Sequence, residues 1–133
     1  MSQENVEIAR RGYEHFVATG ELRREIVHPD FVWDMSTFRG RPEQQTYPGI
    51  EGAMRFIADW TESREEWDHQ LEELRDAGDR VVAILRQSGR SKATGLPAEM
   101  HFAQVWTFRD GKQFRTEMYA TPGEALEAVG LRE

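Results

Sequence analysis

The sequence contains no cysteine. This absence excludes disulfide bonds, thiolate metal sites and a cysteine nucleophile. No apolar run approaches the roughly 18 residues that are needed to cross a bilayer. The N-terminal residues also lack the apolar core of a secretory signal. We therefore expect no membrane partner, and the predicted location is the cytoplasm.

Basic residues are also scarce: 17 Lys and Arg stand against 24 Asp and Glu, which gives a net charge of −7. Nucleic acid is not an expected partner, because its phosphates would be repelled. The sequence has no glycine-rich phosphate loop. No pair of histidines has the HExxH or HxH spacing of a metal site, so neither a metal nor another cofactor is expected.

The chain is long enough for one domain with a hydrophobic core. A chain of 133 residues buries about two thirds of the surface that it exposes when unfolded. Aromatic residues make up 11% of the sequence, which argues against disorder. No linker, repeat or low-complexity tract divides the chain, and we predict a single domain over residues 1–133.

Helical periodicity comes first along the chain. Apolar residues recur every three or four positions up to Gly20, which predicts a first helix; they are Val6, Ala9, Tyr13, Phe16 and Val17. A short helical piece is predicted over 21–27, followed by a loop over 37–49 and a second long helix over 50–62. The motif Thr121-Pro122-Gly123-Glu124 predicts the start of a last helix.

Alternation with a period of two indicates the strands. Residues 31–35 alternate, with Phe31, Trp33 and Met35 on one face. Further strands are predicted after Arg64, over 81–90, over 100–108 and over 114–120, and Asp110-Gly111 predicts a hairpin turn. Helices first and strands later indicate an α+β fold. We expect a curved, mostly antiparallel sheet wrapped around helices, as a cone that holds a small apolar ligand.

Three segments carry a resemblance to a known family: NVEIARRGYEHFVATGEL, HPDFVWDM and AQVWTFRDGKQFRTEMYATPGEALEAVGL. In this order they resemble SnoaL-like proteins of the nuclear transport factor 2-like superfamily. The resemblance implies a cone-shaped α+β barrel, usually dimeric, with a pocket between helices and sheet. The superfamily includes polyketide cyclases, ketosteroid isomerases, dehydratases, epoxide hydrolases and binding proteins, so the resemblance implies no single reaction.

The resemblance also suggests site residues. Tyr13 occupies a position like that of the tyrosine that donates to the oxyanion in ketosteroid isomerases; the alternative is a core tyrosine. The base of the isomerases aligns with Met35, which cannot take a proton, and the neighbouring Asp34 points to the other face by alternation. Their second acid aligns with Gln104. An acid that cyclases use near the last strand is replaced by Thr121, whose structural role is a helix cap.

Other candidates come from the residues themselves. Glu117 alternates in phase with Arg115 and Tyr119 along the predicted strand. If these residues face the cavity, so does Glu117, and if they lie on the opposite face of the strand, Glu117 is a surface residue. His69 is the histidine that could reach the cavity, although no partner is visible for it. The candidates for proton transfer are thus Tyr13, Asp34, His69 and Glu117. The candidates for ligand contact are Tyr13, Trp33, Met35, Trp60, Gln104, Trp106 and Tyr119.

Two hypotheses about function remain open. The protein is either an enzyme, a cofactor-independent cyclase, isomerase or dehydratase acting on an apolar carbonyl compound, or a non-catalytic module for ligand binding or dimerisation. Ketosteroid isomerisation is not expected, since the base position holds methionine. A homodimer is also predicted, because one face of the last strands is too apolar to leave exposed. Its residues are Ala103, Val105, Thr107, Thr116 and Met118.

Overall fold

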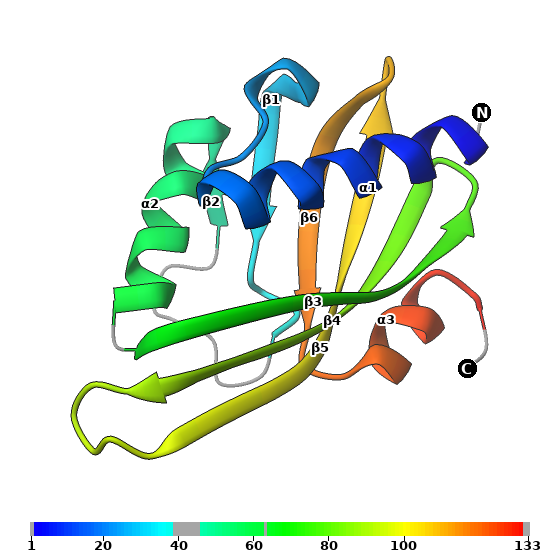
Figure 1. Ribbon diagram of the computed structural model, residues 1–133. Helices are drawn as coiled ribbons and strands as arrows, with labels where there is room; N and C mark the ends of the chain where they lie inside the picture. Colours follow the sequence, from blue (N-terminus) through cyan, green and yellow to red (C-terminus); the bar gives the residue numbers. More distant parts are fainter. Residues whose placement is uncertain (1, 39–45, 63, 132–133) are drawn as a thin grey trace.

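The computed structural model describes residues 2–38, 46–62 and 64–131 (Figure 1). Three α-helices, one 3-10 turn at Arg24–Ile26 and six strands lie within these ranges. The helices are α1 (Ser2–Thr19), α2 (Gly49–Glu62) and α3 (Pro122–Ala128). The strands are β1 (Val27–Asp34), β2 (Thr46–Pro48), β3 (Arg64–Ala77), β4 (Arg80–Ser91), β5 (Pro97–Arg109) and β6 (Lys112–Tyr119).

The six strands form one sheet in the order β2-β1-β6-β5-β4-β3. Every neighbouring pair is antiparallel except β1 and β6, which run parallel. The sheet is curved and does not close on itself (Figure 1). The expected α+β class is therefore confirmed, as is the mostly antiparallel sheet around helices.

Helices cover both faces of the sheet. On the concave face, α1 crosses β3 and β4, and α2 packs on β1 and β2 (Figure 1). On the other face, α3 packs on β4, β5 and β6. No helix in the described part of the chain is long and apolar enough to span a membrane. The space between α1, α2 and the concave face is where a ligand site can form.

The first helix passes very close to the sheet. Ala9 and Tyr13 are buried on its inner side, as the spacing of apolar residues predicts. A Cβ atom added at Gly12 would lie 3.0 Å from Cη2 of Trp106 and 3.1 Å from Cδ1 of Ile26. A larger residue at this position would therefore have to displace the Trp106 ring.

Two elements differ from the sequence prediction. The helical piece predicted over 21–27 is only the short 3-10 turn, and β1 already begins at Val27. The pairing of β1 with β6 shifts between Val27 and Val32, so Pro29, which has no N–H to donate, lies in an irregular stretch where a strand tolerates proline. The loop predicted over 37–49 contains β2, which is only three residues long.

The outer face of the sheet is covered by the chain itself. Ala103 and Val105 pack under Ala125 and Leu126 of α3. Met118 belongs to the core on the concave side. The apolar surface on which the homodimer was predicted is therefore not exposed, and that reason for a dimer is wrong.

The homodimer itself stays a prediction. Light scattering at micromolar concentration measures the mass directly. A mass twice 15.5 kDa would confirm it, and 15.5 kDa alone would contradict it.

Candidate functional site: a cavity under the first helix

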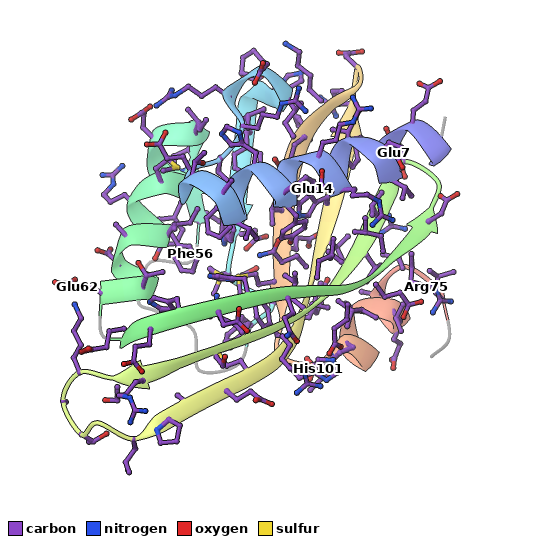
Figure 2. All side chains as sticks on the ribbon, in the orientation of Figure 1. Glu7, Glu14, Phe56, Glu62, Arg75 and His101 are labelled. Atoms are coloured by element: carbon purple, nitrogen blue, oxygen red, sulfur yellow. The ribbon has the colours of Figure 1, made fainter. Side chains whose placement is uncertain are left out.

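A cavity of about 60 Å³ lies between α1, α2 and the concave face of the sheet. Most of its wall is apolar and aromatic. Figure 2 shows one of these side chains, Phe56, on the side of α2 that faces the sheet. The aromatic lining residues are Tyr13, Phe16, Trp33, Phe56, Phe102 and Trp106. Such a wall suits a flat, apolar molecule.

The cavity is small compared with most ligand sites. Pockets for drug-sized ligands usually measure about 300–1,000 Å³. A ligand of more than a few heavy atoms must therefore displace side chains. Those best placed to move are Leu22, Arg23 and Ile26, which line the cavity, are only partly buried and belong to the segment after α1.

The polar groups of the wall are mostly neutral. Three glutamines line the cavity, Gln87, Gln104 and Gln113, and each is at most 7% exposed. His69 lines it too, and Arg23 does so near solvent, where its guanidinium lies 3.2 Å from Glu25. No carboxylate is among the lining residues in the described part of the chain. The wall is therefore built to hydrogen-bond an uncharged ligand.

Gln104 forms the centre of a buried network with Tyr13 and Trp106. Its side-chain oxygen accepts a hydrogen bond from the Tyr13 hydroxyl and another from Nε1 of Trp106 at 3.0 Å. The rings of Tyr13 and Trp106 stack with centroids 5.0 Å apart. Burial raises the pKa of Tyr13, so the phenol stays protonated and acts as a hydrogen-bond donor.

His69 is paired with Gln87. The side-chain nitrogen of Gln87 lies 3.0 Å from Nδ1 and 3.3 Å from Nε2 of His69. An amide nitrogen only donates, so an imidazole nitrogen must accept and His69 is neutral. Burial lowers the pKa of His69, against the opposite effect of Asp68. One lone pair of the imidazole is therefore already engaged by Gln87.

Asp34 and Glu117 lie on the other face of the sheet. They are paired in register on β1 and β6, and Glu117 also pairs with Val105, which packs under α3. Asp34 is 4% exposed and forms an ion pair with Arg115. Neither carboxylate lines the cavity. The alternative in which the side chains of Glu117 and Tyr119 face the cavity is therefore wrong.

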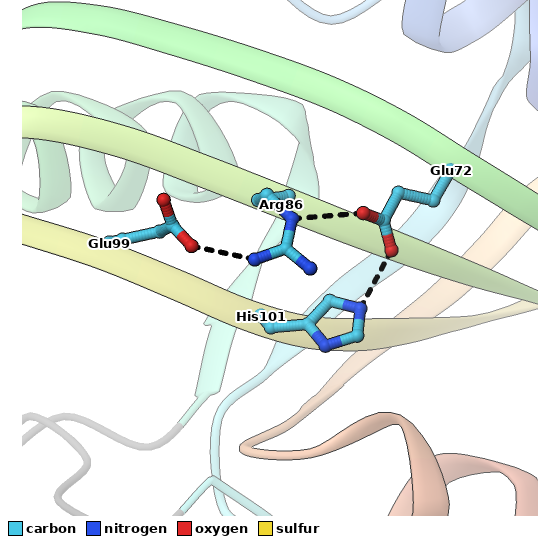
Figure 3. Close-up of polar contacts among 4 residues, drawn as sticks. All are labelled: Glu72, Arg86, Glu99 and His101. Atoms are coloured by element: carbon cyan, nitrogen blue, oxygen red, sulfur yellow. Dashed lines mark hydrogen bonds and ion pairs between the residues drawn. The ribbon is translucent and has the colours of Figure 1, made fainter.

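The outer face also carries an exposed charged cluster of Glu72, Arg86, Glu99 and His101 (Figure 3). Arg86 donates to Glu72 at 2.9 Å and to Glu99 at 2.6 Å. His101 lies 2.7 Å from Glu72. Arg86 is therefore held on the surface, away from the cavity and from Glu117.

The remaining candidates divide as follows. Tyr13, Trp33, His69, Gln104 and Trp106 line the cavity. Met35 is fully buried in the core, where its sulfur accepts from Nε1 of Trp33, and it is not a lining residue. Trp60 belongs to α2, but its side chain lies outside the described part of the structure. The roles of these residues in binding or catalysis stay predictions.

Sequence reasoning missed Gln87 and Gln113. A signal for Gln87 did exist, since it follows Val81, Ala83 and Leu85 at intervals of two. A polar residue that continues the buried side of a strand is a candidate for a cavity wall. Gln113 follows the hairpin turn, and the register between β5 and β6 shifts between Thr107 and Phe108, so its face cannot be counted along the strand.

A model of the SnoaL-like domain family matches residues 9–116. The match covers most of the chain, which therefore belongs to the SnoaL-like domain family. No curated protein shows significant similarity to the sequence.

Solved structures share the fold at low sequence identity. One is a putative SnoaL-like polyketide cyclase from Jannaschia sp. CCS1, with 22% identity, a TM-score of 0.72 and coverage of 99% of this chain and 95% of that chain. Another is a nuclear transport factor 2-like protein of unknown function from Burkholderia pseudomallei K96243, with 20% identity, a TM-score of 0.70 and coverage of 96% and 98%. A third is TerC co-crystallised with polyporic acid, with 24% identity, a TM-score of 0.69 and coverage of 95% and 98%.

Proposed function

We propose that this SnoaL-like protein binds a neutral, apolar carbonyl compound in the cavity under α1. One observation carries the proposal: an aromatic cavity whose polar wall groups, among the described residues, are the uncharged side chains of Thr61, Gln87, Gln104, Gln113 and His69, with the cation of Arg23 near solvent. A charged ligand would lose its hydration without gaining a buried partner of opposite charge. A carbonyl oxygen gains a hydrogen bond and keeps its apolar body in contact with the rings. The neighbour that was co-crystallised with polyporic acid supports the binding of a small molecule by this fold, and the preference for a neutral ligand rests on the cavity wall alone.

Binding without chemistry is the function that the geometry supports best. Proton transfer between carbons needs a base within reach of the ligand. Asp34 and Glu117 lie on the opposite face of the sheet, and a lone pair of His69 is engaged by Gln87. The cyclase, isomerase or dehydratase that the family suggests would depend on His69 alone among the predicted bases.

We expect ligand-observed NMR to detect binding of acetophenone, and Gly12→Leu to weaken it at least about tenfold. The reason is steric, because a Cβ at Gly12 already reaches Trp106 at 3.0 Å and a leucine side chain would fill the small cavity. Ala18→Leu places the same side chain on an exposed site of the same helix, so this control should leave binding unchanged. Equal binding by both variants would place the ligand elsewhere and contradict the proposal.

We also expect no isomerisation of a Δ5-3-ketosteroid above background, measured by the absorbance of the conjugated product. Met35 offers no base, and it does not line the cavity. General acid–base help is worth about 10²–10⁴-fold, and the reaction lacks it here. Turnover that fell with His69→Asn would contradict non-catalytic binding and would identify His69 as the base.

A further inference from the structure

Gln104 is one of the residues that line the cavity. It projects from β5 into the cavity and is 7% exposed. Trp106, two residues further along the same strand, projects from the same face. Tyr13 approaches from α1, so the amide is enclosed by two aromatic rings from two elements.

The chemistry of Trp106 fixes which way the amide points. An indole N–H can donate but cannot accept, so the Gln104 atom 3.0 Å from Nε1 of Trp106 must be the oxygen. The reversed amide would set two donors against each other. The Tyr13 hydroxyl contacts the same oxygen, and it therefore donates as well. Both acceptor positions of that oxygen are occupied, and the proton of Tyr13 is used inside the protein.

The amide nitrogen of Gln104 is left for the ligand. It donates to no side chain or backbone group in the described part of the chain, where the side chain of Gln104 bonds only to Tyr13 and Trp106. No buried side-chain nitrogen or oxygen among the described residues lacks a partner while sealed from solvent. The nitrogen is therefore accessible, and since Gln104 lines the cavity, its two N–H groups are open to the space inside.

We infer that Gln104 is a specificity-determining residue of the cavity, a donor whose orientation is fixed by Trp106 and that selects ligands carrying an acceptor oxygen. The inference rests on the proposed function and names its selectivity. Tyr13 is then a positioning residue that acts through Gln104, in contrast to the oxyanion donor that the family resemblance suggests.

Matched probes test this selectivity by ligand-observed NMR. Acetophenone and ethylbenzene differ by a carbonyl against a methylene, and indole and indene differ by an N–H against a methylene. The wild-type protein is expected to bind acetophenone about tenfold more tightly than ethylbenzene, because a ligand without an acceptor leaves a buried donor unpaired. Indole is expected to gain no hydrogen bond from Gln104, because the oxygen is already occupied, so its preference over indene should be smaller than that of acetophenone over ethylbenzene.

Variants of Trp106 and Tyr13 test whether Trp106 fixes the orientation of the Gln104 amide or only packs against it. Trp106→Phe frees the amide to rotate, so the preference for acetophenone should fall to about twofold and indole should gain on indene. Tyr13→Phe removes the hydroxyl donor and keeps the indole donor, so the preference should fall less than in Trp106→Phe. Ala18→Leu, on an exposed site of α1 outside the cavity lining, should change neither ratio.

A measurement on the intact protein keeps the test independent of variant stability. In a ¹⁵N-labelled sample, the side-chain amide signal of Gln104, assigned by its loss in Gln104→Met, should shift with acetophenone and not with ethylbenzene. If both probes bind equally and this signal does not move, the inference is overturned while ligand binding stands. If no probe binds, the proposed function fails and this inference fails with it.

Discussion

Replacing Met118 by alanine is expected to lower the free energy of unfolding by about 2–5 kcal/mol, the usual cost of removing a large buried side chain. Met118 is 2% exposed and lies on the cavity side of β6. The lost contacts would leave a void in a wall that already borders a cavity. Urea denaturation followed by far-UV circular dichroism measures the change.

The adjacent residue supplies the control. Glu117 lies on the opposite face and is only partly buried, so Glu117→Ala removes a side chain of similar length from a less densely packed place. We expect its effect to stay below about 1 kcal/mol, as for substitutions outside the core. The reverse order of the two effects would show that β6 presents its other face to the cavity.

The sequence alone did not show which residues of β6 face the cavity. The strand alternates between Phe114, Thr116, Met118 and Arg115, Glu117, Tyr119. A search for a base favours the second set inside the cavity, whereas burial of apolar atoms favours the first. In the structure Thr116 and Met118 are the buried ones. Transfer of apolar surface from water, at about 25 cal/mol per Å², decides the face, and the chemistry of the site has no influence on it.

Elements with one covered face were predicted well. On α1 the inner positions Ala9 and Tyr13 are buried, and so are Phe31 and Trp33 of β1 and Met35 just after it, as the alternation predicts. Periodicity is informative there because each element has a single apolar side. The three-residue strand β2 is too short to show any period, and its pairing with β1 depends on distant parts of the chain.

The site was predicted only in part, for a related reason. Tyr13, His69 and Gln104 were candidates because a resemblance or an acid–base role drew attention to them. Gln87 has no such role, and its contact with His69 joins two strands at residues 18 positions apart. Periodicity gives the face of a residue but not its neighbour across the sheet, so a network of amides becomes visible only when the register is known.

The second large effect concerns the ion pair between the buried Asp34 and the partly exposed Arg115 on the outer face. Asp34→Asn is expected to lower the free energy of unfolding at pH 7 by no more than about 1.5–3 kcal/mol, the range for hydrogen bonds to charged groups, because solvent screens the partly exposed Arg115. Burial by itself would raise the pKa of Asp34, but the hydrogen bonds from Ser36 and the charge of Arg115 outweigh it and lower the pKa below its ordinary value of 3.8. Asparagine keeps an acceptor for the Ser36 N–H at 2.8 Å and loses the attraction to Arg115.

The pH dependence follows from the direction of that shift. A carboxyl group whose pKa is lowered by folding stabilises the fold above its unfolded pKa, and this stabilisation is lost as the pH falls through the folded pKa. The difference between wild type and Asp34→Asn should therefore be largest at neutral pH and should shrink below about pH 3.8. Urea titrations at several pH values measure it.

Glu117→Gln provides a matched comparison with the opposite sign. Burial raises the pKa of Glu117, which Arg115 opposes and Asp34 reinforces. Ionised Glu117 therefore disfavours the fold, and the penalty grows as the pH rises above the ordinary value of 4.5. The variant should be more stable than the wild type at pH 7 and equal to it in acid. The double variant should not be additive, because Arg115 serves both carboxylates. A stability gain from Asp34→Asn at pH 7 would mean that burial outweighs the Arg115 pair, contrary to the lowered pKa.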